Sequence, residues 1–420
     1  MKKFLYFIVY SFLCWNIRAQ TPAQDSTFQK IRFGGYGEML YQRMDYGPNR
    51  YKDLAGSPPD KRANISLPRF IVAFDYKFRN DIILGTEIEF EYGGTGAAIE
   101  MEYDESHEYE MEVEKGGEVA LEQFHLTKSF GRAFNVRVGH MIVPIGLTNA
   151  HHEPIFYFGT TRPEGDMTIL PCTWHETGIA FLGAFKFGLQ YEVMVVNGLD
   201  PNAFSRTNWI GSGRQKVFEQ VVMTSPAFAG RLEYTPMQHL RFGASGYFNR
   251  SAKNSIRPQA MSQVKGDVVV ASADAQYRGA NLTARANIIY GTLSDSEEIY
   301  QINRKSFVKS PFASTPVGAA AMAYGAEAGY NVLSFFSAVH SKLLPFVRYE
   351  YYNTFQEKEG DTNVEPRYQC DVLSIGLNYY LLPNLVVKAD YAMRRVGGGK
   401  YNNENTFGVS VGYTGWFFKK

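Results

Sequence analysis

The sequence predicts an all-β protein, a 16-stranded antiparallel transmembrane β-barrel with short periplasmic turns and long extracellular loops. The first observation is composition. The 420 residues include 31 Phe, 28 Tyr and 39 Gly but only 3 Cys, which excludes a disulfide-rich scaffold and a structural zinc module. The second is periodicity, because after about residue 28 the chain alternates apolar with polar or small side chains, as strands with one apolar face do.

The N-terminus has the features of an export signal. Met1–Lys3 carries two lysines, the apolar run from Phe4 to Trp15 follows, and Ala19 supplies a small residue near the expected cleavage point. The apolar run is too short to cross a bilayer as a helix. We therefore expect a signal peptide over 1–19, a short periplasmic segment over 20–28 and the barrel over 29–420.

The strands are predicted one by one from the two-residue alternation. In the first, Phe33 and Tyr41 share one face and Glu38 lies on the other; in the second, Phe70 lies opposite Arg69. The same pattern predicts strands over 29–43, 65–79, 81–92, 118–130, 133–144, 176–184, 187–197, 227–235, 239–250, 265–278, 280–293, 323–332, 344–356, 368–381, 384–396 and 404–418.

The connections between these strands alternate between very short and long, which is typical of a bacterial outer-membrane barrel. A sheet in lipid must close on itself because lipid offers its edge groups no hydrogen-bond partner. A soluble β-sandwich is the alternative. Aromatic residues at strand ends, such as Tyr349, Tyr351 and Phe417, favour the barrel because they match interface girdles. Charges on the opposite face of nearly every strand argue against an apolar sandwich core.

The charged face of each strand is expected to line a lumen. Acidic positions nearly balance the basic ones, so the lining predicts at most a weak ion preference, which we expect to favour anions such as phosphate. The alternative is that many of these charges pair across strands and hold the shape of the wall. The candidate pore-lining cations are Arg32, Arg69, Arg137, Arg231, Arg241, Arg285, Arg348 and Lys388.

The third loop, over 145–175, is too long for an idle hairpin, and loops of this length usually carry function. If it folds inward, its polar residues define a constriction, with His151, His152, Glu153 and Arg162 as the candidates. The His-His-Glu run could instead hold a metal ion, since imidazole and carboxylate are zinc ligands, but its spacing matches no known metal pattern. We expect no metal and no cofactor.

Two cysteines remain after the expected signal peptide. Cys172 lies near the end of the third loop, and Cys370 starts a strand with its side chain on the inward face. In an oxidising compartment they could form a disulfide that tethers the loop to the wall. We state this as a hypothesis.

The second loop is strongly acidic. Glutamates alternate there with apolar residues, so we expect strands that continue beyond the barrel as a hairpin. Its carboxylates could bind divalent ions that bridge lipopolysaccharide, or capture cationic solutes, or form a solvated surface. The residues are Glu100, Glu102, Asp104, Glu105, Glu108, Glu110, Glu112, Glu114 and Glu118.

One stretch resembles a known family. Asn135–Gly146 is a strand that contains Gly139 and ends in Pro144 and Gly146, and it is similar to the strand-to-loop passage of the phosphate-selective porin O/P family. Thr161-Arg162-Pro163 and Glu176-Thr177-Gly178-Ile179 resemble that family's return from the third loop. The resemblance implies a homotrimeric channel whose third loop enters the lumen. It also implies phosphate specificity from clustered lysines and arginines, a cluster that this chain does not show.

The motifs of common enzymes are missing. The sequence has no Gly-x-Ser-x-Gly elbow, no His-Glu-x-x-His and no phosphate-binding loop, and its net charge of +1 gives no reason to expect nucleic acid. We therefore expect an outer-membrane porin that passes small hydrophilic solutes or ions by diffusion, in contact with membrane lipid and lipopolysaccharide. The alternative is a surface binding protein or adhesin displayed on a plugged barrel.

Overall fold

A computed structural model describes residues 28–48, 59–94, 97–103, 109–115, 117–215, 221–305, 315–336, 341–401 and 403–420. The expected signal peptide over 1–19 lies outside these residues, as does the short segment that follows it except for Phe28.

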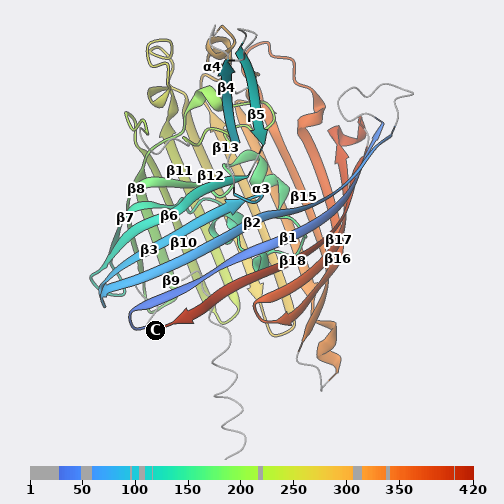
Figure 1. Ribbon diagram of the computed structural model, residues 1–420. Coiled ribbons are helices and arrows are strands. Elements are labelled where there is room, and N and C mark those ends of the chain that lie inside the picture. The colour runs from blue at the N-terminus through green and yellow to red at the C-terminus, as the bar shows by residue number, and fades with distance from the viewer. Residues whose placement is uncertain are drawn as a thin grey trace, which may run out of the picture.

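Sixteen antiparallel strands close into a barrel, because β1 pairs with β2 on one side and with β18 on the other (Figure 1). The predicted fold class is confirmed. The barrel strands are β1 (Ile31–Pro48), β2 (Pro59–Arg79), β3 (Ile82–Glu91), β6 (Glu118–Ser129), β7 (Asn135–Ile142), β8 (His175–Ala184), β9 (Leu189–Val196), β10 (Ala227–Met237), β11 (Leu240–Arg250), β12 (Asp267–Arg278), β13 (Leu282–Leu293), β14 (Ala320–Tyr330), β15 (Lys342–Glu357), β16 (Gln369–Leu382), β17 (Leu385–Val396) and β18 (Asn403–Lys419).

The strands have one apolar outer face and one polar inner face. On β2, Phe70 and Phe78 are exposed on the outside while Arg69 and Asp75 are buried inside. Successive side chains of a strand point to opposite faces, so the two-residue alternation of the sequence becomes this division directly. The largest departures from the expected bounds are at the facing ends of β1 and β2, which continue pairing as far as Pro48 and Pro59.

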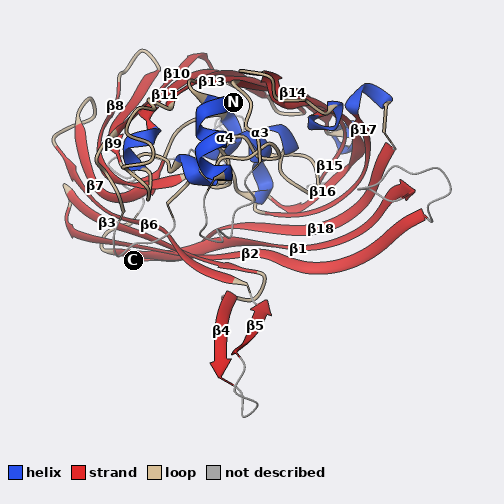
Figure 2. Cartoon of the chain, turned by 90° about the horizontal axis from the view of Figure 1, so that it is seen from above, coloured by secondary structure: helices blue, strands red, loops and turns tan. Residues whose placement is uncertain are grey.

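The acidic second loop forms a separate two-stranded sheet of β4 (Ala97–Tyr103) and β5 (Tyr109–Lys115). Seen from above, this hairpin projects away from the ring of barrel strands (Figure 2). The expected hairpin is therefore present. Its backbone register places Glu100 opposite Glu112 and Glu102 opposite Glu110.

Short helices occupy the long connections. No described helix combines the length and the apolar composition that a bilayer crossing requires. These helices are α2 (Leu147–Ala150), η2 (Pro154–Phe156), α3 (Glu164–Ile169), η3 (Pro201–Ala203), η4 (Ser251–Asn254), α4 (Ser296–Arg304), η5 (Val332–Phe335), η6 (Pro366–Tyr368) and η7 (Gly397–Gly399).

An apolar core lies inside the barrel along strands β7 to β14. Loop residues such as Ile169, Trp174 and Trp209 pack there against inward-facing Val270 and Ile289 of the wall. Both tryptophans are fully buried. The long loops therefore fill the interior beside these strands with an apolar core, while inward-facing charges such as Arg231, Asp274 and Arg285 lie elsewhere on the same strands.

Candidate functional site

The third loop, Val143–Trp174, leaves β7, passes through the inside of the barrel and returns to β8; we call it the inward loop. Seen from above, its helix α3 lies within the ring of strands (Figure 2). Gly146 has φ +79, a backbone conformation that favours glycine, and its N–H donates to Ser245 Oγ of β11 at 3.1 Å. This glycine therefore turns the chain inward toward β11, four strands away from β7 in the ring.

Glycine is also required in β7, the strand that leads into the inward loop, where it packs against β6. Gly139 of β7 has φ +134, and a Cβ at this position would lie 2.3 Å from the carbonyl oxygen of Phe124 on β6. At the loop's base, the Asn149 side chain donates to the carbonyl of Val143 and accepts from the N–H of Trp174. These contacts fix both ends of the loop.

Polar side chains of β17 hold the middle of the inward loop. Lys388 Nζ donates to the carbonyls of Tyr157 at 2.8 Å and Gly159 at 3.0 Å. The N–H of Thr160 donates to Asp390 Oδ2 at 2.7 Å. Further along β17, Arg394 forms an ion pair with Glu164. The far wall therefore binds the loop through both its backbone and its side chains.

A second group of contacts, which we call the His152 tether, holds the loop to β1, β2 and β6. His152 Nε2 lies 3.1 Å from Glu122 Oε1 and 2.8 Å from the hydroxyl of Tyr36, which itself contacts Glu122. His152 Nδ1 lies 3.0 Å from the carbonyl of Asn149. Both ring nitrogens thus face acceptors, which favours a protonated imidazolium that donates from each nitrogen. Arg69 Nη2 also donates to the carbonyl of His152 at 3.1 Å.

The two neighbouring histidines titrate in opposite directions. Burial lowers the pKa of His152, but the charge and hydrogen bond of the Glu122 carboxylate outweigh burial and raise it to about 9. Burial lowers the pKa of His151 to about 3, and the adjacent Arg241 guanidinium acts in the same direction. His152 is therefore a cation at neutral pH, and His151 is neutral.

The His152 tether is expected to weaken at alkaline pH. Its pKa is raised from 6.5 to about 9, so its stabilisation of the bound loop is complete below about pH 6.5 and is lost as the pH rises through about 9. In planar bilayers, current fluctuations should therefore increase between pH 8 and 10. In the variant His152→Gln, this increase in current fluctuations should be absent, whereas any pH response that comes from lysines should remain. An identical pH profile for both proteins would contradict the role of the tether.

The structure places all eight candidate pore-lining cations inside the barrel, and all but the half-buried Arg241 are buried. Lys388 donates to loop carbonyls, whereas each arginine has a carboxylate partner, so the charges pair across the wall rather than forming a free cationic ring. The pairs are Arg32 with Asp75, Arg69 with Glu38, Arg137 with Glu192, Arg231 with Glu233 and Asp274, Arg241 with Glu233, Arg285 with Glu327, and Arg348 with Glu327 and Glu350.

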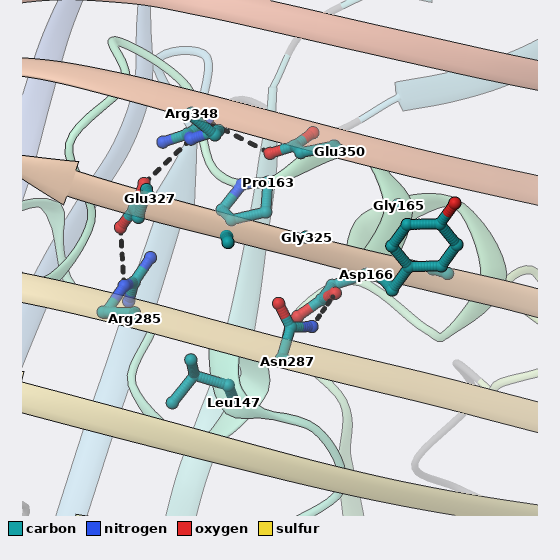
Figure 3. Close-up of a pocket in the computed structure, with 13 residues that line it drawn as sticks. Leu147, Pro163, Gly165, Asp166, Arg285, Asn287, Gly325, Glu327, Arg348 and Glu350 are labelled. Atoms are coloured by element: carbon teal, nitrogen blue, oxygen red, sulfur yellow. Dashed lines mark hydrogen bonds and ion pairs between the residues drawn. The ribbon is translucent and has the colours of Figure 1, made fainter.

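The strongest of these networks lies behind α3. Glu327 Oε2 accepts from Arg348 Nε at 2.8 Å, and Glu327 Oε1 pairs with Arg285 at 2.5 Å, so one buried carboxylate serves two buried guanidiniums (Figure 3). Between this network and Pro163 of the loop lies a cavity of about 20 Å³, room for one water molecule. The loop is therefore packed against this wall almost without a gap.

A larger cavity of about 550 Å³ lies on the side of the short turns, beneath the inward loop. Its roof includes His151, His152 and Glu153, and its walls include Glu87 and Arg137. Three of the four constriction candidates therefore line this cavity. Arg162 is not part of this lining; it donates to Thr173 Oγ1 and Cys172 Sγ within the loop, each at 2.8 Å.

The disulfide hypothesis needs correction. Cys172 and Cys370 are separate free thiols, one exposed and contacted by Arg162, the other buried in the wall, so no disulfide tethers the loop. The His-His-Glu run does not form a shared ligand set either, because His151 faces Arg241 while His152 faces Glu122. Polar contacts hold the loop in place of a covalent bond.

Several important acidic residues are absent from the expected lining. Glu122 was missed because a register shift between β3 and β6 breaks the two-residue alternation just at this position. Glu327 and Asp274 lie in strands made largely of small residues, where a single inward charge gives little pattern. The useful signal was their isolation, because a lone charge on a strand of alanines and glycines needs a partner inside the barrel.

The fold defines a 16-stranded barrel of the porin type. Solved structures that share it are the anion-selective porin from Comamonas acidovorans (TM-score 0.53, 10% identity, 92% of this chain and 99% of that one) and the outer membrane channel DcaP of Acinetobacter baumannii (0.53, 11%, 92% and 97%). Salmonella typhi OmpF in complex with daunomycin is a third (0.52, 11%, 91% and 97%). At these identities the likeness concerns the fold alone.

In sequence, the chain is 26% identical over 380 residues to an uncharacterized protein of Aquifex aeolicus (strain VF5), covering 88% of this chain and 78% of that protein. No family model matches the sequence.

Proposed function

We propose that this protein is an outer-membrane channel for the passive diffusion of small hydrophilic solutes and ions, with the inward loop as its constriction. The observation that carries the proposal is the arrangement of this loop. It crosses the interior of a closed barrel on polar tethers, above a polar cavity of about 550 Å³ that reaches the rim of short turns near Asn384 and Lys419. A constricting loop of this kind sets the size of the solutes that pass.

The outer surface supports a bacterial outer-membrane location, with lipid and lipopolysaccharide as partners. Large apolar side chains are exposed around the barrel wall, as a lipid-facing surface requires. Examples from different strands are Phe70, Val138, Leu232, Ile288 and Leu377. In this setting the short turns are periplasmic and the long loops extracellular. Trimeric assembly rests on the resemblance to the phosphate-selective porin O/P family alone.

The pairing of the arginines does not support a phosphate preference. A phosphate site needs cations whose charge is available to the anion. Here the guanidiniums of Arg137, Arg285 and Arg348 are each paired with a carboxylate of a neighbouring strand. We therefore propose a channel for small solutes without phosphate specificity.

A second candidate function is favoured by the apolar core inside the barrel. Residues of the 198–226 loop, among them Phe204, Trp209 and Ile210, pack with the inward loop against the wall. Trp209 Nε1 donates to the carbonyl of Gly318 at 2.9 Å, and this hydrogen bond also holds the loop inside the barrel. A barrel filled in this way could serve as a plugged anchor that displays the β4–β5 hairpin to a ligand.

Reconstitution into a planar bilayer separates the two candidates. We expect the folded mature protein to give discrete conductance steps in KCl, since the cavity beneath the inward loop reaches the rim of short turns and the loop is held only by polar contacts. Folding is checked first by heat-shifted mobility on gels, and detergent without protein is the control. A silent bilayer from folded protein would contradict the channel and favour the plugged anchor.

A further inference from the structure

A row of carboxylates follows the polar wall of the barrel from one side of the inward loop to the other. Glu87, Glu89 and Glu91 are alternate residues of β3 and share its inner face, with about 7 Å between successive positions. Glu91 lies at the end of β3 near the long loops, whereas Glu87 lines the large cavity near the short turns. The row therefore runs along the direction in which a solute would travel.

A bulge in β6 adds another carboxylate to this row. Glu87 is opposite Gln123, but the next residue, Ile88, is opposite Leu121, so β6 has one extra residue at Glu122. A bulge lets two consecutive side chains reach the same side of a sheet. Gln123 Nε2 donates to Glu87 Oε2 at 2.6 Å, and Glu122 contacts Tyr36 inside the barrel.

The nearby cations are already used by other groups. Arg69 pairs with Glu38 at 3.2 Å, and His152 pairs with Glu122 at 3.1 Å. The partner of Glu87 is the neutral amide of Gln123. Arg162 donates to Thr173 and Cys172, and among the described residues neither Arg69 nor Arg162 forms a hydrogen bond or ion pair with Glu89. This wall therefore differs from that of β13 to β15, where two arginines and two glutamates interlock.

Glu89 is the member of the row with a buried oxygen that no described residue contacts through a hydrogen bond. Its side chain is 4% exposed, and its Oε1 has no hydrogen-bond partner among the described residues. A buried carboxylate oxygen without a donor is costly. A hydrated cation that passes along the row would supply the missing partner, whereas an anion would meet repulsion from the carboxylates on either side.

We propose that Glu87 and Glu89 form a cation-selective track past the inward loop, so that the channel prefers small cations to anions. This inference rests on the proposed channel function and names the class of solute that the channel favours. The selectivity arises from two carboxylates of β3 that have no ion-pair partner among the described residues, whereas the neighbouring Glu122 is paired with His152.

The test is the reversal potential in a KCl gradient across a planar bilayer, recorded at pH 9 so that Glu87 and Glu89 are both ionised. We expect the wild-type protein to show the sign of a cation-selective pore. The double variant Glu87→Gln/Glu89→Gln should lower the permeability ratio of K⁺ to Cl⁻ by about threefold or more, because it removes two charges without changing side-chain size. Asp371→Asn is the control and should leave the ratio unchanged, because Asp371 lies on the outer face of β16, where it accepts from the hydroxyl of the exposed Tyr349.

The outcomes separate this inference from the channel proposal. A conducting wild-type protein that selects anions, or a double variant with an unchanged ratio, would overturn the cation track and leave the channel intact. A folded wild-type protein that never conducts would overturn both. If the double variant does not fold, the sign of the wild-type reversal potential still decides the inference.

Discussion

Replacing Glu327 by alanine is expected to destabilise the barrel by about 3–5 kcal/mol, the range found when one partner of a buried ion pair is removed. The carboxylate is buried and pairs with both Arg285 and Arg348, so its loss leaves two guanidiniums inside the barrel with reduced compensation. Arg348 would keep its contact with Glu350 at 3.4 Å, whereas Arg285 has no other carboxylate partner among the described residues.

The measurement is urea-induced unfolding in lipid vesicles, followed by tryptophan fluorescence. The matched control is Asp267→Ala, which breaks the more exposed pair of Asp267 with Arg250 and should cost no more than about 1 kcal/mol. If Glu327→Ala and the control lose equal stability, the network at Glu327 is not the structural element that we describe. Replacing all three charged residues by apolar ones of similar volume should recover part of the loss.

Loosening the inward loop is expected to increase conductance by about twofold or more, because the narrowest part of the passage is set by tethered residues. The change is to replace residues 153–164 by a glycine–serine linker of the same length. This removes the side chains of Tyr157, Thr160 and Glu164 that bind the wall. Lys388 and Arg394 would then face water, so the barrel should still fold.

Single-channel recording in KCl is the measurement. The control is deletion of 97–115, the β4–β5 hairpin, which forms a sheet separate from the barrel. Its removal should change conductance little. Equal conductance in the linker variant and the wild-type protein would show that the inward loop does not limit the passage.

The alternation of the sequence predicted the strands well because each strand has two chemically different environments. Outside, lipid-compatible residues such as Phe70 and Phe78 are exposed, and inside, Arg69 and Asp75 are buried. The prediction was least accurate where pairing continues past the ends of β1 and β2, because rim residues face water on both sides and lose the pattern. At β6 it failed at Glu122, where the bulge changes which residues face inward.

The candidate site was predicted in composition but not in arrangement. His151 and His152 are adjacent, yet one faces Arg241 and becomes neutral while the other faces Glu122 and becomes a cation. Their different protonation depends on Glu122 and Arg241, which lie about 30 and 90 residues away in the chain. A local sequence pattern contains no information about contacts at this sequence separation. The same reason explains the cysteines, whose separation depends on the path of the loop.

The sequence by itself determined the closed antiparallel barrel, its strand order and the inner and outer faces, since these follow from two-residue periodicity and from the need to satisfy every backbone group in lipid. Only the tertiary structure decided how the interior is used. Closure of the barrel brings Glu327 between two arginines, Glu122 against His152, and the loops into an apolar core. Charge pairing and burial act between residues far apart in sequence, so the unpartnered oxygen of Glu89 could be recognised only after closure.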